Sequence, residues 1–145
     1  MLRYIKARTA DLPHGQAMAS TSPRKRLVAV VEDDPAVLDS LHFTLDVQGY
    51  DVCLFNQGGK AIASDEILAA DCLLIDYGLP DMNGLILLSQ LRSRGLTCAA
   101  VIIASNPGAL PQAQTRRAGA AVIEKSQMGE AMNDLIRAVV ADRAA

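Results

Sequence analysis

The sequence contains no tryptophan and only five aromatic residues among its 145. Base stacking and aromatic cages both depend on such side chains, so these two kinds of ligand recognition are disfavoured. No uninterrupted apolar stretch reaches the roughly 18 residues that a membrane-spanning helix needs. We therefore expect a chain without a membrane segment. The aromatic residues are Tyr4, Phe43, Tyr50, Phe55 and Tyr77.

Cysteine is also scarce, with three residues, no CxxC motif and no neighbouring histidine that would complete a zinc site. Cys53, Cys72 and Cys98 each lie in or beside an apolar run, where cysteine usually acts as a small buried hydrophobic residue. An odd number of cysteines without a pairing motif indicates a reduced, cytoplasmic protein. We therefore assign no chemistry to these three thiols.

The composition, 50% hydrophobic and 21% charged, suits one globular domain with a sizeable core. Charge is unevenly placed, because residues 1–26 carry six basic residues and one acidic residue, which leaves 8 basic and 15 acidic residues in the rest. We expect a flexible basic tail at 1–26, an acidic domain at 27–141 that does not bind nucleic acid, and a C-terminal end at 142–145 without an output domain. The segment "MASTSPRKR" follows 17 residues without a pattern, so we expect translation to start at Met18.

Five short apolar runs recur along the chain at intervals of 21 to 27 residues. They are continuous rather than alternating, which is typical of strands that are buried on both faces of a parallel sheet. Because right-handed crossovers place the intervening helices on both faces, the sequence predicts an α/β fold: a doubly wound (βα)5, flavodoxin-like sandwich with a five-stranded parallel sheet. The runs cover residues 27–31, 50–55, 72–75, 99–104 and 120–123.

Helix signals lie between these runs. Asp34 suits an N-cap and Pro35 suits the first helical position after it. Other helices are expected near 58–69 and 109–118, with glycine or proline weakening both patterns. Apolar stripes at helical spacing are formed by Val37, Leu38, Leu41 and Leu45, by Leu85, Leu88 and Leu91, and by Met128, Met132, Leu135, Ile136 and Val139.

Distinctive polar residues follow four of the predicted strands at their carboxyl ends, where open α/β sheets bind ligands. They are Glu32, Asp33 and Asp34 after the first strand, Asp76 after the third, Ser105 after the fourth and Lys125 after the fifth. Carboxylates about 4 Å apart repel by roughly 4 kcal/mol per pair at an effective dielectric near 20. Lys125 and one divalent cation would balance three of them, and an all-oxygen ligand set favours Mg²⁺.

These residues resemble the receiver domain of two-component response regulators, the CheY-like phosphoacceptor family, over residues 27 to about 141. The resemblance depends on the acidic pair, then Asp-x-x-x-Pro-x-x-x-Gly (Asp76, Pro80, Gly84), then a hydroxyl residue and then a lysine, in that order. The stretches that carry it are "LVAVVEDDPAVL", "CLLIDYGLPDMNGL", "VIIAS" and "AGAAVIEKS".

The resemblance implies roles for individual residues. Asp76 would accept the phosphoryl group, with Ser105 as the switch hydroxyl and Lys125 as the charge-balancing lysine. Glu32, Asp33, Asp76 and the main-chain carbonyl of Gly78 would bind Mg²⁺, with Asp33 a direct ligand. The phosphoryl donor would be a sensor histidine kinase or a phosphotransfer protein, and the signal would pass to a downstream protein target by contact.

The chain departs from the family pattern near its C-terminal third. Val122 stands where the family usually has tyrosine or phenylalanine, Ser126 where proline usually follows the lysine, and Asn106 where a small residue usually follows the hydroxyl. A partner is expected to dock on residues 106–140, which include these three positions. We also expect the helix near 109–118 to be short and mobile and to become ordered on phosphorylation.

Two other functions compete with this one. The altered positions would also suit a pseudo-receiver, an interaction domain that works without phosphorylation. A haloacid-dehalogenase-type phosphatase needs a second aspartate two residues after the first, and Gly78 occupies that place. We therefore expect slow self-dephosphorylation rather than enzymatic turnover, and the sequence leaves open whether the chain forms a homodimer.

Overall fold

The structure is a computed structural model, and it describes residues 3–5 and 24–144. Its central feature is a six-stranded sheet. Its strands occur in the order β1-β3-β2-β4-β5-β6, and β2 to β6 are parallel to one another. These five strands coincide with the five apolar runs, so the predicted doubly wound α/β fold is confirmed. They are β2 (Leu27–Val31), β3 (Asp51–Phe55), β4 (Cys72–Asp76), β5 (Ala99–Ala104) and β6 (Ala120–Glu124).

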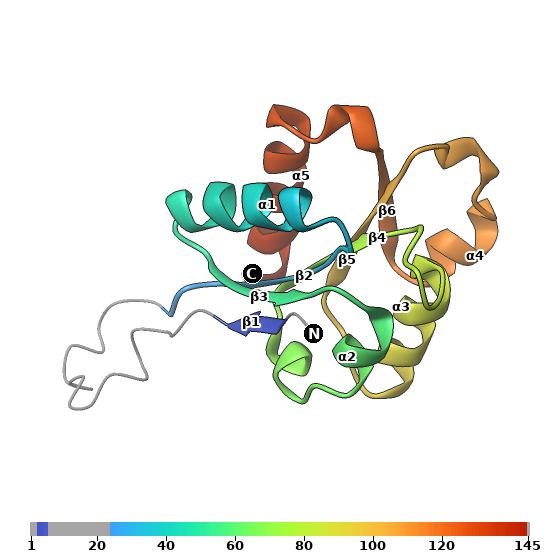
Figure 1. Cartoon of the computed structure of the whole chain (residues 1–145), viewed down its shortest axis with the longest axis horizontal. Coiled ribbons are helices and arrows are strands. Elements are labelled where there is room, and N and C mark those ends of the chain that lie inside the picture. The colour runs from blue at the N-terminus through green and yellow to red at the C-terminus, as the bar shows by residue number, and fades with distance from the viewer. Residues whose placement is uncertain (1–2, 6–23, 145) are drawn as a thin grey trace.

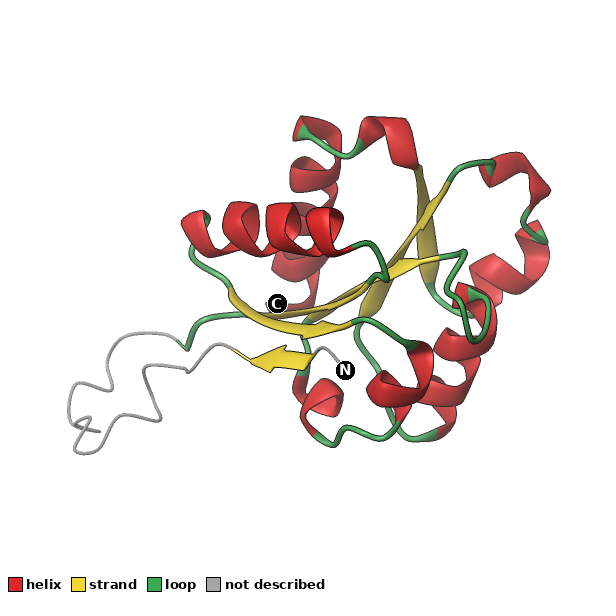
Figure 2. Ribbon diagram, viewed as in Figure 1, coloured by secondary structure: helices red, strands yellow, loops and turns green. Residues whose placement is uncertain are grey.

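Helices cover both faces of the sheet, as Figures 1 and 2 show. On one face lie α1 (Pro35–Val47) and α5 (Glu130–Ala144), and on the other lie α2 (Gly58–Ile62) and α3 (Gly84–Ser93). The short α4 (Gln112–Arg117) lies beside α3. Short 3₁₀ turns are η3 (Glu66–Ala69), η4 (Pro107–Ala109) and η5 (Lys125–Gln127).

Alternate strand residues pack into two separate apolar cores, one under each layer of helices. Ala29 and Leu73 pack on the α3 side, whereas Val30 and Leu74 pack on the α1 and α5 side. This arrangement explains why the apolar runs are continuous, because both faces of each strand are buried. The three cysteines are buried and unbridged, as predicted.

The start of α1 follows the local sequence signal. The Asp34 carboxylate accepts a hydrogen bond from the Ala36 N–H at 2.9 Å, and Pro35 occupies the first turn. Leu38, Leu41 and Leu45 are buried on the inner side of the helix. The predicted cap, proline and apolar stripe are therefore confirmed.

The helix predicted at 58–69 is divided in two. The Ser64 hydroxyl accepts a hydrogen bond from the Glu66 N–H, and the Arg94 guanidinium donates to the carbonyl oxygens of Ile62 and Ser64. These side chains replace the bonds that a continuous helix would make, so α2 ends at Ile62. Near 109–118, α4 begins only after Pro111 and has six residues; the predicted short length is confirmed, and its mobility stays a prediction.

The predicted N-terminal tail contains one strand that the sequence analysis missed. β1 (Arg3–Ile5) pairs antiparallel with β3, because an unpaired sheet edge offers N–H and C=O groups to any short extended segment. For these three residues, the prediction of a flexible tail is wrong. Arg24 donates to both oxygens of the buried Asp71 at 3.2 and 3.0 Å, which ties the end of the tail to the sheet. Met18 and the rest of the tail lie outside the described residues.

Among residues 3–5 and 24–144, none of the helices combines the length and the apolar character that crossing a bilayer requires.

Gly84 allows α3 to begin directly against the end of β4. A Cβ atom at this position would lie 2.9 Å from Ile75 Cγ2, 3.0 Å from Tyr77 Cα and 3.1 Å from the Asp76 carbonyl oxygen. We expect Gly84→Ala to lower the free energy of unfolding by about 1–3 kcal/mol, because two of these contacts are with backbone. Urea denaturation followed by circular dichroism measures this change. Gly129→Ala is the control, since a Cβ there would meet no atom within 4 Å, and equal stability of the two variants would contradict the prediction.

Candidate functional site

Three carboxylates meet at the carboxyl end of the sheet. β2 and β4 are adjacent and parallel, with Val31 paired to Ile75, so Glu32 and Asp76 occupy the next positions on neighbouring strands. One carboxylate oxygen from each of Glu32, Asp33 and Asp76 lies within 4.8 Å of the other two. Glu32 and Asp76 are buried and Asp33 is exposed. The structure therefore brings these three predicted site residues together.

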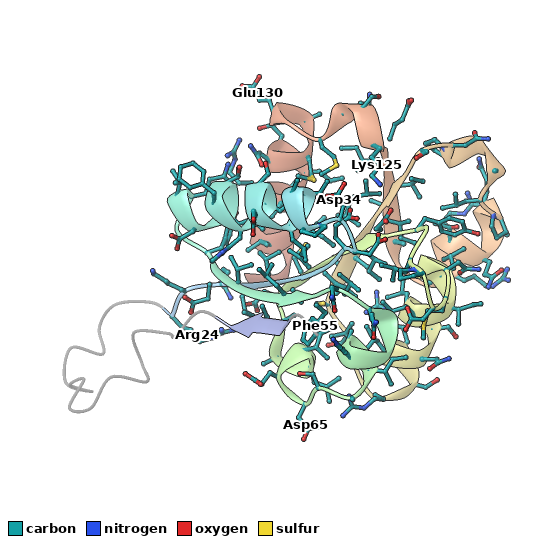
Figure 3. All side chains as sticks on the ribbon, in the orientation of Figure 1. Arg24, Asp34, Phe55, Asp65, Lys125 and Glu130 are labelled. Atoms are coloured by element: carbon teal, nitrogen blue, oxygen red, sulfur yellow. The ribbon has the colours of Figure 1, made fainter. Side chains whose placement is uncertain are left out.

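Lys125 supplies a positive charge close to Asp76. Its Nζ lies 3.6 Å from Asp76 Oδ1, at the point where β6 ends and η5 begins. In Figure 3, Lys125 lies at the same end of the sheet as Asp34, which follows β2. The neighbouring strands β5 and β6 pair Ala104 with Glu124, so Ser105 and Lys125 directly follow this pair. Ser105 is exposed.

The electrostatics of the cluster are unfavourable without a further cation. Burial, followed by the nearby Asp76 carboxylate, raises the pKa of Glu32 from 4.5 to about 7. Glu32 Oε2 accepts a hydrogen bond from the Asp34 N–H at 3.2 Å, whereas the buried Oε1 has no hydrogen-bond partner within the described part of the chain. Lys125 balances only one of the three negative charges.

This donor set fits a hard divalent cation. The three carboxylates offer oxygen ligands alone, which suit Mg²⁺ better than softer transition metals. The unpartnered Oε1 of Glu32 has lone pairs for which the surrounding protein provides no donor. Both observations are consistent with a metal-ligand role for this group.

The loop after Asp76 is closed by backbone hydrogen bonds. The Tyr77 N–H donates to the Ile103 carbonyl at 2.9 Å, and the Gly84 N–H donates to the Tyr77 carbonyl at 2.8 Å. Gly78 and Asn83 form an isolated antiparallel bridge, and the Gly78 N–H lies 3.4 Å from Asp76 Oδ1. The predicted ligand Gly78 is thus held beside the predicted acceptor.

Asp81 is a contributor to this loop that the sequence analysis missed. Its carboxylate accepts hydrogen bonds from the Gly58 N–H at 3.0 Å and the Gly59 N–H at 2.8 Å. Desolvation opposes ionisation, but the bonds from Gly59 and Gly58 lower the pKa of Asp81 below its ordinary value. Met82 packs where a Gly58 side chain would lie, with its Cγ 2.8 Å from that position. The sequence signal that could have indicated this contact was the Gly58-Gly59 pair, which also weakened the helix prediction.

Of the three positions predicted to face a partner, two follow strand ends, Asn106 after β5 and Ser126 after β6, whereas Val122 lies in the middle of β6. Asn106 and Ser126 are exposed, and Val122 is half-buried. Val122 lines a cavity of about 300 Å³ together with Leu110 and Thr115. The valine is smaller than the aromatic residue usual in the family, and the cavity adjoins it.

Glu32 predicts a pH dependence of stability in the metal-free protein. Its pKa is higher in the folded state, about 7, than the ordinary 4.5, so the folded state binds more protons and loses stability as the pH rises between these values. Relative to the wild type, the free energy of unfolding of Glu32→Gln should increase by about 2 kcal/mol between pH 5 and pH 8. Urea denaturation in the presence of a chelator measures this difference, in which any constant effect of the amide cancels. If the free energies of unfolding of the variant and the wild type differed by the same amount at both pH values, the prediction would be wrong.

Asp81→Ala should loosen the contact between the acceptor loop and α2. Amide hydrogen exchange at Gly58 and Gly59 should become faster, and the free energy of unfolding should fall by about 1 kcal/mol at pH 7, as for a lost helix cap. Because the folded-state pKa is lowered, this stabilisation is present at neutral pH and disappears as the pH falls through the acidic range. Asp39→Ala, which removes an exposed acid from α1, is the control. Unchanged exchange at both glycines would refute the contact.

Comparison with known proteins agrees with this geometry. Residues 28–137 match the response regulator receiver domain family. The chain is 33% identical over 94 residues to the transcriptional regulatory protein KdpE of Mycobacterium tuberculosis. This alignment covers 65% of this chain and 41% of KdpE. It is 37% identical over 67 residues to the sensory transduction protein RegX3 of Mycolicibacterium smegmatis, covering 46% of this chain and 29% of RegX3. The chain thus spans less than half the length of these relatives.

Solved structures share the fold. A CheY-like response regulator receiver domain protein from Methanospirillum hungatei JF-1 superposes with a TM-score of 0.74 at 23% identity, covering 83% of this chain and 97% of that one. The response regulator TrrA from Thermotoga maritima, solved in complex with Mg²⁺-BeF, gives a TM-score of 0.67 at 17% identity over 79% of this chain and 98% of that one. With the match over residues 28–137, the chain belongs to the response regulator receiver domain family, the phosphoacceptor modules of two-component signalling.

Proposed function

We propose that this chain accepts a phosphoryl group on Asp76 from a sensor histidine kinase or a phosphotransfer protein. The observation that carries the proposal is the buried Asp76 carboxylate, 3.6 Å from Lys125 Nζ and clustered with Glu32 and Asp33. Response regulators in general exchange signals with histidine kinases and downstream targets. The proposal assigns the same relay to this chain, with a downstream protein as its target.

Asp76 is proposed as the nucleophile of the transfer. A carboxylate oxygen forms a bond to phosphorus while the P–N bond of the partner's phosphohistidine breaks, and the leaving imidazole nitrogen takes up a proton. Lys125 Nζ, already near Oδ1, is placed to offset the negative charge on the transferring oxygens. The product is an acyl phosphate on Asp76.

Receiver domains bind Mg²⁺ at an acidic pocket. In this chain, Glu32, Asp33, Asp76 and the main-chain carbonyl of Gly78 would hold the ion, with Asp33 a direct ligand. When bound, Mg²⁺ would supply positive charge against the phosphoryl oxygens. The unpartnered Glu32 Oε1 and the all-oxygen donor set support this assignment.

Ser105 and Lys125 are proposed to convert phosphorylation into a change of shape. The phosphoryl group adds negative charge and acceptor oxygens, to which the Ser105 hydroxyl and the Lys125 ammonium can donate. Ser105 lies two residues before η4, and Lys125 is the first residue of η5. Asn106, Val122 and Ser126 are the proposed positions at which a downstream protein reads the change.

The remaining parts of the proposal concern how the chain works as a protein. It would act in the cytoplasm, where its three buried, unbridged cysteines stay reduced. It would relay the signal by protein contact, either as a monomer or as a homodimer, and would lose its phosphoryl group by slow self-dephosphorylation.

A phosphorylation-independent pseudo-receiver is the second candidate. The half-buried Val122 and the cavity beside it favour this alternative, because a valine cannot act as the aromatic switch usual in the family. The intact cluster of Glu32, Asp33, Asp76 and Lys125 favours the phosphorylated receiver.

Intact-mass measurement separates the two candidates. After incubation with a small-molecule phosphodonor and Mg²⁺, the wild type should gain one phosphoryl group, and Asp76→Asn should gain none because an amide is not a nucleophile. Asp39→Asn, an exposed acid on α1, should gain as much as the wild type. Absence of a phosphoryl group on the wild type, or equal gain by Asp76→Asn, would favour the pseudo-receiver.

A further inference from the structure

Charge is strongly segregated within the folded part of the chain. From Met82 to Ile123 the sequence contains four arginines and no aspartate or glutamate, although acidic residues outnumber basic ones from residue 27 onward. This stretch includes α3, β5, α4 and most of β6. This segment of an otherwise acidic domain therefore carries a net positive charge.

Three of these arginines have no carboxylate partner among the described residues. Arg94 forms an ion pair with Asp65 at 2.7 Å. Elsewhere in residues 24–141, the remaining arginines are also in ion pairs: Arg24 and Arg26 with Asp71, and Arg137 with Asp134. The arginines without such a partner in that range are Arg92, Arg116 and Arg117, all on α3 or α4.

The Arg92 guanidinium is held by four hydrogen bonds to backbone carbonyls and has no carboxylate partner in the part of the chain that the structure describes. Its Nε and Nη2 donate to the Ala118 carbonyl at 3.0 and 2.8 Å, and its Nη1 donates to the carbonyls of Leu96 and Cys98 at 3.1 and 2.6 Å. Gly119 makes room for this guanidinium, since a Cβ there would lie 3.1 Å from Nη2. One Nη2 hydrogen is not used in these bonds, and the carbonyls carry no net charge.

Arg92 and Arg117 line one cleft between α3 and α4, which lie side by side in Figure 1. The cleft has a volume of about 410 Å³. Ser89, Ser93 and Gln114 add hydroxyl and amide donors, and the nearly buried Leu85 borders the cleft. No carboxylate is among its lining residues.

We propose that this cleft binds an acidic peptide segment of a partner protein. Carboxylates of the segment pair with Arg117 and with the free N–H of Arg92, where fixed guanidinium geometry favours planar oxyanions. The volume exceeds what a single small anion needs. Base stacking has no support here, because no aromatic residue follows Tyr77 in the sequence.

This binding surface goes beyond the proposed phosphoryl transfer and does not depend on it. The cleft residues are separate from the acidic cluster around Asp76, and binding requires neither Mg²⁺ nor phosphorylation. The two proposals therefore fail in different experiments.

The test uses the full chain, labelled with ¹⁵N, at low salt and with a chelator. The probe is a blocked peptide of sequence Glu-Leu-Glu-Glu-Leu-Glu, and amide shifts report where it binds. We expect shifts concentrated in residues 85–93 and 114–118. Arg117→Ala should weaken binding about fivefold, whereas the control Arg137→Ala, an exposed arginine on α5, should change it less than about twofold.

Four outcomes would overturn the proposal. Absence of shifts in the cleft, or equal weakening by both arginine variants, would mean that attraction is nonspecific. Inorganic phosphate at the same concentration giving the same shifts would identify a small-anion site. Tighter binding of a single-stranded oligonucleotide with the same cleft shifts would identify a nucleic-acid surface. Far-UV circular dichroism verifies that both variants are folded.

Discussion

Repulsion between carboxylates at one edge of the sheet is the constraint on which the site depends. The parallel register of β2 and β4 places Glu32 beside Asp76, and burial keeps water from screening them. Lys125 compensates one charge at 3.6 Å, and Glu32 responds with a raised pKa. The remaining excess of negative charge makes a cation favourable there. The arrangement that costs stability in the metal-free protein is thus the one that the proposed phosphoryl transfer would use.

The backbone around the site holds this arrangement independently of its charges. Tyr77 is bonded to the adjacent strand β5, Gly84 lets α3 start against β4, and Asp81 joins the acceptor loop to α2. Two apolar cores, one on each face of the sheet, support the strands that end here. Because these contacts are neutral or lie at the edge of the site, carboxylate repulsion is not sufficient to open it.

Local signals explain what could be predicted from the sequence. Continuous apolar runs marked the five parallel strands, Asp34-Pro35 marked the start of α1, and the common direction of the strands brought Asp76 and Lys125 together. What was missed depends on distant partners. β1 is three residues long and exists through its pairing with β3. Arg94 interrupts the helix at 58–69 from 30 residues away, and Asp81 reaches glycines 22 and 23 residues before it. The periodicity of the sequence gives no indication of such contacts.

The most direct measurement is an NMR titration of the Glu32 side-chain carboxyl carbon, without Mg²⁺ and with saturating Mg²⁺. We expect a pKa of about 7 without the cation, since burial and Asp76 both oppose ionisation. The pKa should fall below that value when Mg²⁺ is present, because added positive charge favours the carboxylate. A pKa that stays at the ordinary 4.5 in both conditions would contradict the crowded, cation-dependent site described above.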